Sequence, residues 1–434
     1  MTHQRYNSQS LPAAGLRLAY LVGTYPALTT TFIAREVVLL QQLGAQLKVF
    51  SIRRPAEPLT PEQRDLEKGV VCLLPAGILS LLAAHLRFAL LRPTKYFGTL
   101  FYLLTRPHET VASRFKTLLH FGEGVYWAAL LRRARWDQLH AHFVDRAATL
   151  AIVAGSLLDI PYSVTAHAND IYVSPVLLLE KLSRASFVAT CTGYNQNHLT
   201  RHLPPALAHK VKRIYHGLDL EAYRRESHVP SSKPLLVSVG QLKEKKGFAY
   251  LLDACRLLRD AGHDFECQIV GEGPLRDSLQ QQIRRLALED TVTLCGALPH
   301  SQVVEKYRRA TLFVLPCVLG GDGDRDGIPN VILEAMAMEL PVVSTRHSGI
   351  PEVVHDGING LLVEPGDIRA LTAALAHLLD DPATARRFGS RARHTVLENF
   401  DLATNVKRLL AEFLSGKQSE AWQHAVAEVV EHSR

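Results

Sequence analysis

Residues 320–341 (GGDGDRDGIPNVILEAMAMELP) combine a glycine-rich loop with a sequence that favours a helix. Pro329 suits the first turn of that helix, which has to end before Pro341. The loop therefore leads into a helix amino terminus, where free backbone amides and the positive end of the helix dipole favour phosphate groups or sugar hydroxyls. The residues expected at this helix start are Gly327, Ile328, Pro329 and Asn330.

Two carboxylates frame the same helix start. Asp326 precedes it, and Glu334 lies inside the predicted helix. Because helical side chains lean toward the amino terminus, we expect Glu334 to point back toward Asp326, so that both carboxylates reach one ligand. Asp326 and Glu334 are therefore candidate catalytic residues.

Two other interpretations of this loop remain open. Residues 322–326 (DGDRD) match the opening of a calcium-binding EF-hand loop, but such a loop needs a bidentate Glu at its twelfth position, which is Leu333 here. A helix that begins near Pro329 also falls where the calcium loop would still coordinate its ion. The second interpretation is structural: a charged, solvated loop that precedes a core helix.

The elements that must position these residues follow a repeating pattern. Short runs rich in Val, Ile and Leu are each followed by turn residues and by a longer stretch with helical spacing. This alternation predicts an α/β protein with two doubly wound parallel sheets. In the first half we predict strands at residues 16–22, 47–52, 138–141, 162–165, 187–191 and 211–215. In the second half we predict them at 235–239, 266–270, 292–294, 312–315, 342–345 and 360–363.

The predicted sheets define the domains. Residues 1–216 are predicted to form one Rossmann-like domain, and residues 217–400 are predicted to form a second. Residues 401–434 are predicted to be a helix that packs back on the first domain. Proline and serine between residues 224 and 234 mark a linker. We expect the two domains to face each other across a cleft, because ligands of parallel sheets bind at the strand carboxyl ends.

Residues 62–136 differ from the rest of the first domain and are predicted to be a basic, amphipathic helical insertion. One apolar helical face would consist of Leu81, Ala84, Phe88 and Leu91. A basic amphipathic stretch can lie on an anionic membrane surface, where each cation contributes about 1 kcal/mol. Helices of soluble proteins have a similar pattern when their apolar side faces the core. Both interpretations remain open.

Bulk properties limit the class of protein and its location. The chain of 434 residues has a formal net charge of +7, which favours anionic partners without choosing among them. Its six cysteines form no CxxC pair, which indicates a reducing compartment. The polar amino terminus lacks a signal peptide, and the most apolar stretch, residues 73–91, contains Pro, His and Arg. We therefore expect a cytoplasmic protein without a transmembrane helix, peripheral at most to the inner face of the membrane.

Residues 326–334 (DGIPNVILE) resemble the E-x7-E signature of the retaining GT-B glycosyltransferases of family 4, or glycosyltransferase group 1. Residues 348–352 (SGIPE) resemble the G-G-x-P-E element of the same family. Within the family, the likeness is greatest to enzymes that build colanic acid and similar exopolysaccharides. Asp326 departs from the signature, because it is one methylene shorter than the usual Glu.

The resemblance also implies a diphosphate site. Residues 239–247 (VGQLKEKKG) are similar to the family element V-G-R-L-x-x-K-K-G, in which the Arg and the last Lys bind the donor diphosphate. Lys246 matches that lysine. Gln241 replaces the arginine, and it can donate a hydrogen bond but carries no charge. Lys243 or Lys245 is a candidate for part of the missing charge.

Three further positions are implied by the resemblance. Residues 162–172 (YSVTAHANDIY) are similar to the T-x-H-x-x-D segment of the family, which makes His167 a candidate catalytic residue. Gly23 begins a stretch that resembles the amino-terminal loop beside the diphosphate, with three adjacent threonines. Gly271 begins a G-x-G-P turn that is expected near the nucleotide.

The activity that the resemblance implies is transfer of a glycosyl unit from a nucleotide-diphosphate sugar, with retention at the anomeric carbon. The acceptor would be a hydroxyl of a glycan or of a polyprenyl-diphosphate-linked oligosaccharide. The resemblance also implies that residues 1–216 bind the acceptor and that residues 217–400 bind the nucleotide-sugar donor. No cofactor and no obligatory metal are expected. The alternatives are a nucleotide-sugar epimerase of the same fold and a non-catalytic binder of an anionic surface. A nucleic-acid partner is not expected, because basic residues are spread along the chain without an aromatic-basic motif.

Overall fold

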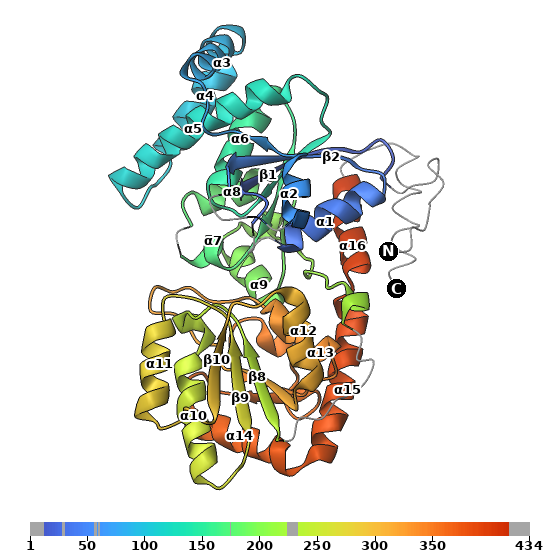
Figure 1. Ribbon diagram of the computed structural model, residues 1–434. Helices are drawn as coiled ribbons and strands as arrows, with labels where there is room; N and C mark the ends of the chain where they lie inside the picture. The colour runs from blue at the N-terminus through green and yellow to red at the C-terminus, as the bar shows by residue number, and fades with distance from the viewer. Residues whose placement is uncertain are drawn as a thin grey trace. The chain divides into compact units, whose positions relative to one another are not determined.

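The structure, a computed structural model, describes residues 13–27, 31–55, 59, 61–173, 175–223 and 233–415 (Figure 1). They divide into two compact units. The first holds the described residues up to Cys191, those of Asn195–His216 and those from Ala403 onward, and the second holds Thr192–Tyr194 and the described residues of Gly217–Leu402. Most of the predicted linker, two of the predicted loop threonines (Thr29 and Thr30) and the predicted tail helix beyond Ser415 lie outside the described residues.

The first unit contains a parallel sheet of seven strands in the order β3-β2-β1-β4-β5-β6-β7. Its strands are β1 (Arg17–Thr24), β2 (Gln46–Arg53), β3 (Val71–Cys72), β4 (Gln138–His142), β5 (Tyr162–Ala166), β6 (Val188–Thr190) and β7 (Val211–Arg213). Every residue of β4 and β5 is buried, as expected for central strands of a parallel sheet that helices cover on both faces.

Helices surround this sheet (Figure 1). They are α1 (Thr31–Gln42), α2 (Pro61–Glu67), α3 (Ile78–Leu91), α4 (Pro93–Thr105), α5 (Val111–Leu131), α6 (Arg146–Leu158), α7 (Asn169–Tyr172), α8 (Leu178–Arg184), α9 (Gly193–Arg201) and α16 (Leu402–Ser415). α16 belongs to this unit through Phe413, whose ring lies 5.1 Å from that of His140 and 5.3 Å from that of Phe187.

The segment predicted as a helical insertion is largely helical and also adds β3 to the sheet. Its last helix, α5, packs along α6 and places the buried Trp127 and Val125 in the main core. On α3 the predicted apolar face is only partly turned inward. Ala84 and Phe88 are buried, whereas Leu91 is exposed.

The second unit contains a parallel sheet of six strands in the order β10-β9-β8-β11-β12-β13. Its strands are β8 (Leu235–Val239), β9 (Glu266–Val270), β10 (Val292–Gly296), β11 (Leu312–Leu315), β12 (Val342–Thr345) and β13 (Gly360–Val363). Its α-helices are α10 (Phe248–Asp260), α11 (Arg276–Arg285), α12 (His300–Arg309), α13 (Asn330–Ala337), α14 (Ile368–Asp380) and α15 (Pro382–Asn399). In the first sheet the chain adds β1, β2 and β3 toward one edge and then β4 to β7 toward the other, so the winding reverses between β1 and β4. In the second sheet the same reversal lies between β8 and β11.

The predicted pair of doubly wound parallel sheets is confirmed. Five of the six strands predicted in the second half have the predicted bounds, and β10 extends two residues further. Among the described strands, only β3 was missed, because two residues are too few to give a periodic signal. Strand carboxyl ends meet at one edge of a parallel sheet, and ligands bind there at the point of reversal.

Candidate functional site

In the second unit, the side chains of Lys246 and Asp326 meet beyond the carboxyl ends of two neighbouring strands. Lys246 follows β8 and Asp326 follows β11, the pair of strands at which the winding reverses. The Nζ atom of Lys246 lies 2.7 Å from Oδ2 of Asp326. Two residues that the sequence proposed separately are therefore joined at the edge of the sheet where open parallel sheets bind ligands.

A second lysine extends this ion pair. Lys245 Nζ lies 3.3 Å from Oδ1 of Asp326 and 2.9 Å from Oδ2 of Asp324. Glu244, from the same turn, accepts a hydrogen bond of 2.9 Å from the backbone amide of Gly321. The turn after β8 and the glycine-rich loop after β11 are thus held together by charge and by a hydrogen bond.

Lys246 and Asp326 keep their charges because they are in contact. Burial alone would lower the pKa of Lys246, but the carboxylates and thiol around it, Asp326 first, outweigh burial and raise that pKa. Burial alone would raise the pKa of Asp326, but the charges of Lys246 and Lys245 outweigh it and lower that pKa. At neutral pH the site therefore presents the Lys246 ammonium group beside the Asp326 carboxylate, and ammonium N–H groups suit phosphate oxygens.

The helix after the glycine-rich loop, α13, begins at Asn330, one residue later than expected. Pro329 stands at the N-cap with φ −61° and ψ 124°, so the prediction that it lies in the first helical turn was wrong. Proline has no side-chain oxygen to cap the first amides of the helix, which leaves them suited to a ligand. The loop is fixed on its other side, where the Gly327 carbonyl accepts a hydrogen bond of 3.3 Å from the amide of Gly349.

Glu334 is held by a tyrosine. The Tyr307 hydroxyl donates a hydrogen bond of 3.1 Å to Oε2 of Glu334. Burial and the nearby Glu334 carboxylate raise the pKa of Tyr307 well above its usual value, so its hydroxyl remains a donor. Asp326 is held by the lysines instead. The convergence of both carboxylates on one ligand stays a prediction, because in this structure each has its own partner.

Glycine is required at two turns beside the Lys246–Asp326 pair. Gly247 has φ 69°, and a Cβ on it would lie 1.8 Å from the carbonyl oxygen of Pro316. A Cβ on Gly271 would lie 1.8 Å from the carbonyl oxygen of Gly240. At these positions the loops after β9 and β11 lie so close to the turn after β8 that there is no room for a Cβ atom. Gln241, in that turn, is exposed.

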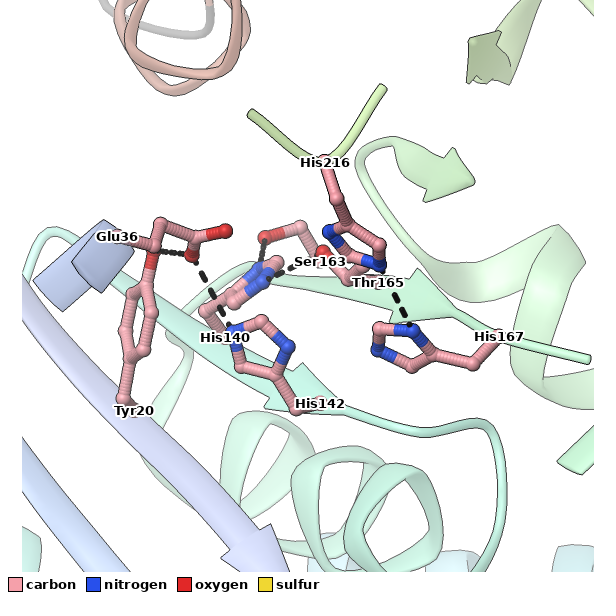
Figure 2. A network of polar contacts seen from close by, with 8 residues as sticks. All are labelled: Tyr20, Glu36, His140, His142, Ser163, Thr165, His167 and His216. Atoms are coloured by element: carbon pink, nitrogen blue, oxygen red, sulfur yellow. Dashed lines mark hydrogen bonds and ion pairs between the residues drawn. The ribbon is translucent and has the colours of Figure 1, made fainter. Parts of the chain in front are cut away.

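In the first unit, a buried polar network surrounds Glu36 of α1 (Figure 2). The Tyr20 hydroxyl donates a hydrogen bond of 2.9 Å to Oε1 of Glu36, and the same oxygen lies 3.2 Å from Nε2 of His142. His142 is the last residue of β4, and its ring stacks on that of His167 with centroids 5.9 Å apart. The carboxylate is thereby linked through His142 to the predicted site histidine.

His167 lies beyond the end of β5 and has one ring nitrogen without a partner. Its Nδ1 lies 3.3 Å from Nε2 of His216, and the two rings are stacked within 12° (Figure 2). Its Nε2 is buried and has no hydrogen-bond partner among the described residues. Burial, reinforced by the neighbouring histidines, holds the pKa of His167 well below its usual value, so the ring is neutral. A ligand hydroxyl would satisfy such a ring nitrogen.

Asp170 fixes the backbone that carries His167. Its Oδ1 accepts the amide of His167 at 2.9 Å, and its Oδ2 accepts the amide of Val144 at 2.5 Å. The ring of Phe32 lies 5.0 Å from that of His167 and closes one side of it. Gly23, also predicted at the site, lies at the carboxyl end of β1, where a Cβ would meet nothing within 4 Å. No conformational need for glycine explains that position.

Two groups of side chains in the first unit are close enough to hold a metal ion. They are Glu36 with His140 and His142, and His167 with Cys191 and His216, with ligand atoms within 4.8 Å of one another. Hydrogen bonds account for two members of the first group, because the His140 ring contacts Ser163 Oγ at 2.8 Å and Thr165 Oγ1 at 3.0 Å while Glu36 binds Tyr20. Nδ1 of His142 is buried and has no hydrogen-bond partner among the described residues. In the second group the two histidines contact each other.

Sequence reasoning assigned no role to Glu36, His216 or His347. The first two join the His167 network from distant parts of the chain. In the loop after β12, His347 Nε2 and Ser348 Oγ are buried without a hydrogen-bond partner among the described residues. Burial lowers the pKa of His347. Its place directly before residues 348–352 (SGIPE) was the one signal in the sequence.

The chain is similar to known glycosyltransferases. Residues 219–395 match the profile of a family described as glycosyl transferases group 1. WcaL of Salmonella typhimurium, named for colanic acid biosynthesis, is 39% identical over 200 residues, and the alignment covers 46% of this chain. It covers 49% of WcaL, so the chain spans about half the length of that relative.

A longer alignment and a solved structure extend the likeness to both units. The GDP-mannose-dependent alpha-(1-6)-phosphatidylinositol monomannoside mannosyltransferase of Mycolicibacterium smegmatis is 32% identical over 327 residues, 73% of this chain and 82% of that protein. Anabaena HepE, solved in complex with UDP, has a TM-score of 0.68 at 18% identity and covers 93% of this chain and 100% of its own. At that identity the likeness concerns the fold.

Proposed function

Because the chain belongs to the group 1 glycosyltransferases, we propose that it transfers a sugar from a nucleotide-diphosphate donor to an acceptor hydroxyl, with retention at the anomeric carbon. The observation that carries this proposal is the contact of Lys246 with Asp326 at the point where the winding of the second sheet reverses. Cations and a carboxylate held side by side suit a ligand that combines phosphates with sugar hydroxyls.

Lys246 and Lys245, both from the turn after β8, bind the donor diphosphate. Lys246 donates to its oxygens and stabilises the charge that develops as the diphosphate leaves. Gln241 contributes a hydrogen bond without charge, and Lys245 supplies the second cation, since its ammonium group already reaches Asp326. The amides at the start of α13 complete the anion site.

The carboxylates and His167 bind hydroxyl groups. Glu334, oriented by Tyr307, and Asp326, oriented by the lysines, accept hydrogen bonds from the donor sugar. His167 uses its unpaired Nε2 for a hydroxyl of the reacting sugar or of the acceptor. The reaction requires no protein nucleophile, because the rate comes from positioning and from stabilising the leaving group.

The acceptor is a glycan or a polyprenyl-diphosphate-linked oligosaccharide in exopolysaccharide biosynthesis. The likeness to WcaL supports this class of acceptor. No organic cofactor and no obligatory metal take part, since lysine cations and helix amides are available for the diphosphate.

A thermal-shift panel of UDP, GDP, ADP and their sugars tests donor binding. A ligand at 100 times its dissociation constant adds about 2.7 kcal/mol of stability, which a melting curve resolves. The stabilising donor is then incubated with and without extracted lipid-linked acceptors. Sugar transfer only with acceptor supports the proposal, whereas isomerised donor without acceptor would identify an epimerase. Absence of any shift would refute the nucleotide-sugar site.

A further inference from the structure

The helices α3, α4 and α5 expose an unusual number of apolar side chains. Among the described residues, twenty large apolar side chains are exposed, and twelve of them belong to these three helices. Monomeric soluble proteins rarely expose continuous apolar patches of more than a few hundred Å², and larger ones mark an interaction surface. The concentration of exposed apolar side chains on three helices marks this region as a candidate interaction surface.

On α3 the apolar side chains form a stripe toward solvent. Leu82, Leu86 and Leu90 are spaced four residues apart, and Leu79 at the start of the helix is 82% exposed. The same helix buries Ala84 and Phe88 on its other side. α3 is therefore folded against its own unit and still has a second apolar face.

The next two helices repeat this arrangement. Phe97 and Phe101, one turn apart on α4, are both exposed. Val111 is 87% exposed at the start of α5, and Phe115 and Leu119 follow at intervals of four residues. The three helices pack on one another, and α3 and α4 lie at one end of the first unit, beyond α5 (Figure 1). We call these exposed side chains of α3, α4 and α5 the apolar face.

Cations accompany the apolar face, and acids are nearly absent from it. Four exposed cations of this region, Arg87, Arg106, Arg114 and Lys116, have no carboxylate within ion-pair distance among the described residues, whereas the exposed Arg92 pairs with Asp159. Between residues 78 and 131 the sequence has only two acids, and one of these, Glu123, is paired with Arg146. An apolar face with unpaired cations is suited to a surface that is both apolar and negatively charged.

We propose that the apolar face of α3, α4 and α5 binds the surface of an anionic lipid bilayer, with its leucines and phenylalanines in the acyl boundary and its cations among the headgroups. Long basic side chains can keep their charge at headgroup level while their stems lie along apolar surface. In the part of the chain that the structure describes, no helix is long and apolar enough to cross a bilayer, so this contact is interfacial.

Charge favours a bilayer over a second copy of the chain. Two copies joined through this face would bring the cations of both together, and like charges at an interface are unfavourable. Anionic headgroups offer the opposite charge, and each cation near them contributes roughly a fivefold gain in partitioning. This inference does not depend on the proposed catalytic activity.

Vesicle sedimentation of the full chain tests the proposal. We expect binding to vesicles of phosphatidylcholine mixed with phosphatidylglycerol, weaker binding to phosphatidylcholine alone, and a decrease with salt. A triple variant, L79Q/L82Q/L86Q, should bind at least about tenfold more weakly, because three apolar side chains no longer enter the acyl region. The variant R114Q/K116Q should lose anionic selectivity.

Matched controls separate a surface effect from damage to the fold. Ile358 (51% exposed) and Leu397 (46%) lie in the second unit, and I358Q/L397Q should bind as the wild type does. Glu334→Ala should bind normally even though it affects the proposed chemistry, so failure of one proposal is distinguishable from failure of the other. Melting curves verify folding, and a single F101S variant serves if the triple variant unfolds.

Two results would overturn the proposal. One is no sedimentation with anionic vesicles, or equal sedimentation of the wild type and the triple variant. The other is a dimer in light scattering that the triple variant dissolves, with no vesicle binding by either form. That outcome would make the apolar face an interface between copies of the chain.

Discussion

Lys246 and Asp326 form an ion pair of 2.7 Å between the loops that follow two neighbouring strands of the second sheet. Each side chain maintains the charge of the other against burial. Asp326 is one methylene shorter than the residue usual at this place in the family, and the ion pair holds it against the lysines. The ion pair therefore holds the lysine proposed to bind the diphosphate next to the carboxylate proposed to bind sugar hydroxyls before a donor is bound.

Replacement of Lys246 by alanine should lower kcat/KM by about 10² to 10³, since a preorganised donor to the leaving group is removed. Lys243→Ala is the matched control, because Lys243 lies in the same turn, is exposed and has no ion pair among the described contacts. Initial-rate kinetics on both variants, with melting curves, measure the difference. Near-normal activity of a folded K246A protein would contradict the diphosphate role.

Substitution of Glu334 should lower activity more than substitution of Tyr307, the tyrosine that orients it. Glu334→Ala is expected to cost at least about 10² in turnover, whereas Tyr307→Phe keeps the ring and removes only the hydrogen bond of 3.1 Å. The tyrosine variant should lose about 1 kcal/mol of stability and less activity than the glutamate variant. Comparison of kcat for the two proteins decides the order, and the reverse order would remove Glu334 from the site.

Substitution of His167 should mainly lower activity, whereas substitution of Asp170 should lower the stability of the fold. His167→Ala is expected to lower activity with a modest effect on stability, because its Nε2 has no partner among the described residues. Asp170→Asn turns an amide toward one of the two backbone N–H groups that Asp170 accepts, which leaves a buried donor unsatisfied at a cost of about 1–3 kcal/mol. Denaturant unfolding together with activity separates the two. An H167A variant with full activity would show that the histidine is structural.

The neutral histidines of the first unit should make the protein sensitive to acid. Burial lowers the pKa of His216 from 6.5 to about 4. The unfolded chain binds this proton as pH falls through 6.5 and the folded protein does so only near 4, so its stabilising contribution is complete above 6.5 and is lost toward 4. Each unit of pKa difference corresponds to about 1.4 kcal/mol.

Urea unfolding between pH 7 and pH 4 measures this effect, and H216Q should have the flatter profile because glutamine does not titrate. H394Q, at a histidine that is exposed in the second unit, is the control and should follow the wild type. Identical slopes for H216Q and the wild type would mean that His216 is not buried in its neutral form.

Removal of divalent metal should leave the activity unchanged. Hydrogen bonds account for Glu36 and His140 in the first group of potential metal ligands, and lysines are available for the diphosphate. Donor turnover before and after exhaustive chelation is the measurement. A loss that Mg²⁺ or Mn²⁺ restores would overturn the expectation and direct attention to the two ligand groups of the first unit.

The sequence by itself determined the secondary elements of the second unit and the family. The strands of that unit are continuous apolar runs between clear turn residues, and such local patterns do not depend on distant contacts. The family signature was equally local, since it lies within one loop and one helix. That assignment is confirmed by the profile match and by the mannosyltransferase alignment.

Only the tertiary structure decided which candidates share a site. Asp326 pairs with Lys246 and Lys245, whereas Glu334 pairs with Tyr307, because the pairings depend on which loops the parallel strands bring to the same edge. Glu36 and His216 join His167 for the same reason and carry no local signal.

The sequence predicted a basic amphipathic insertion at residues 62–136 but not which of its helical faces is exposed. Helical periodicity identifies which residues share a face, but it does not determine which face the core covers. Leu91 was expected on the core side of α3 and shares a helical face with the buried Ala84 and Phe88, but it is the last residue of the helix, where the burial of that face ends, and it is exposed.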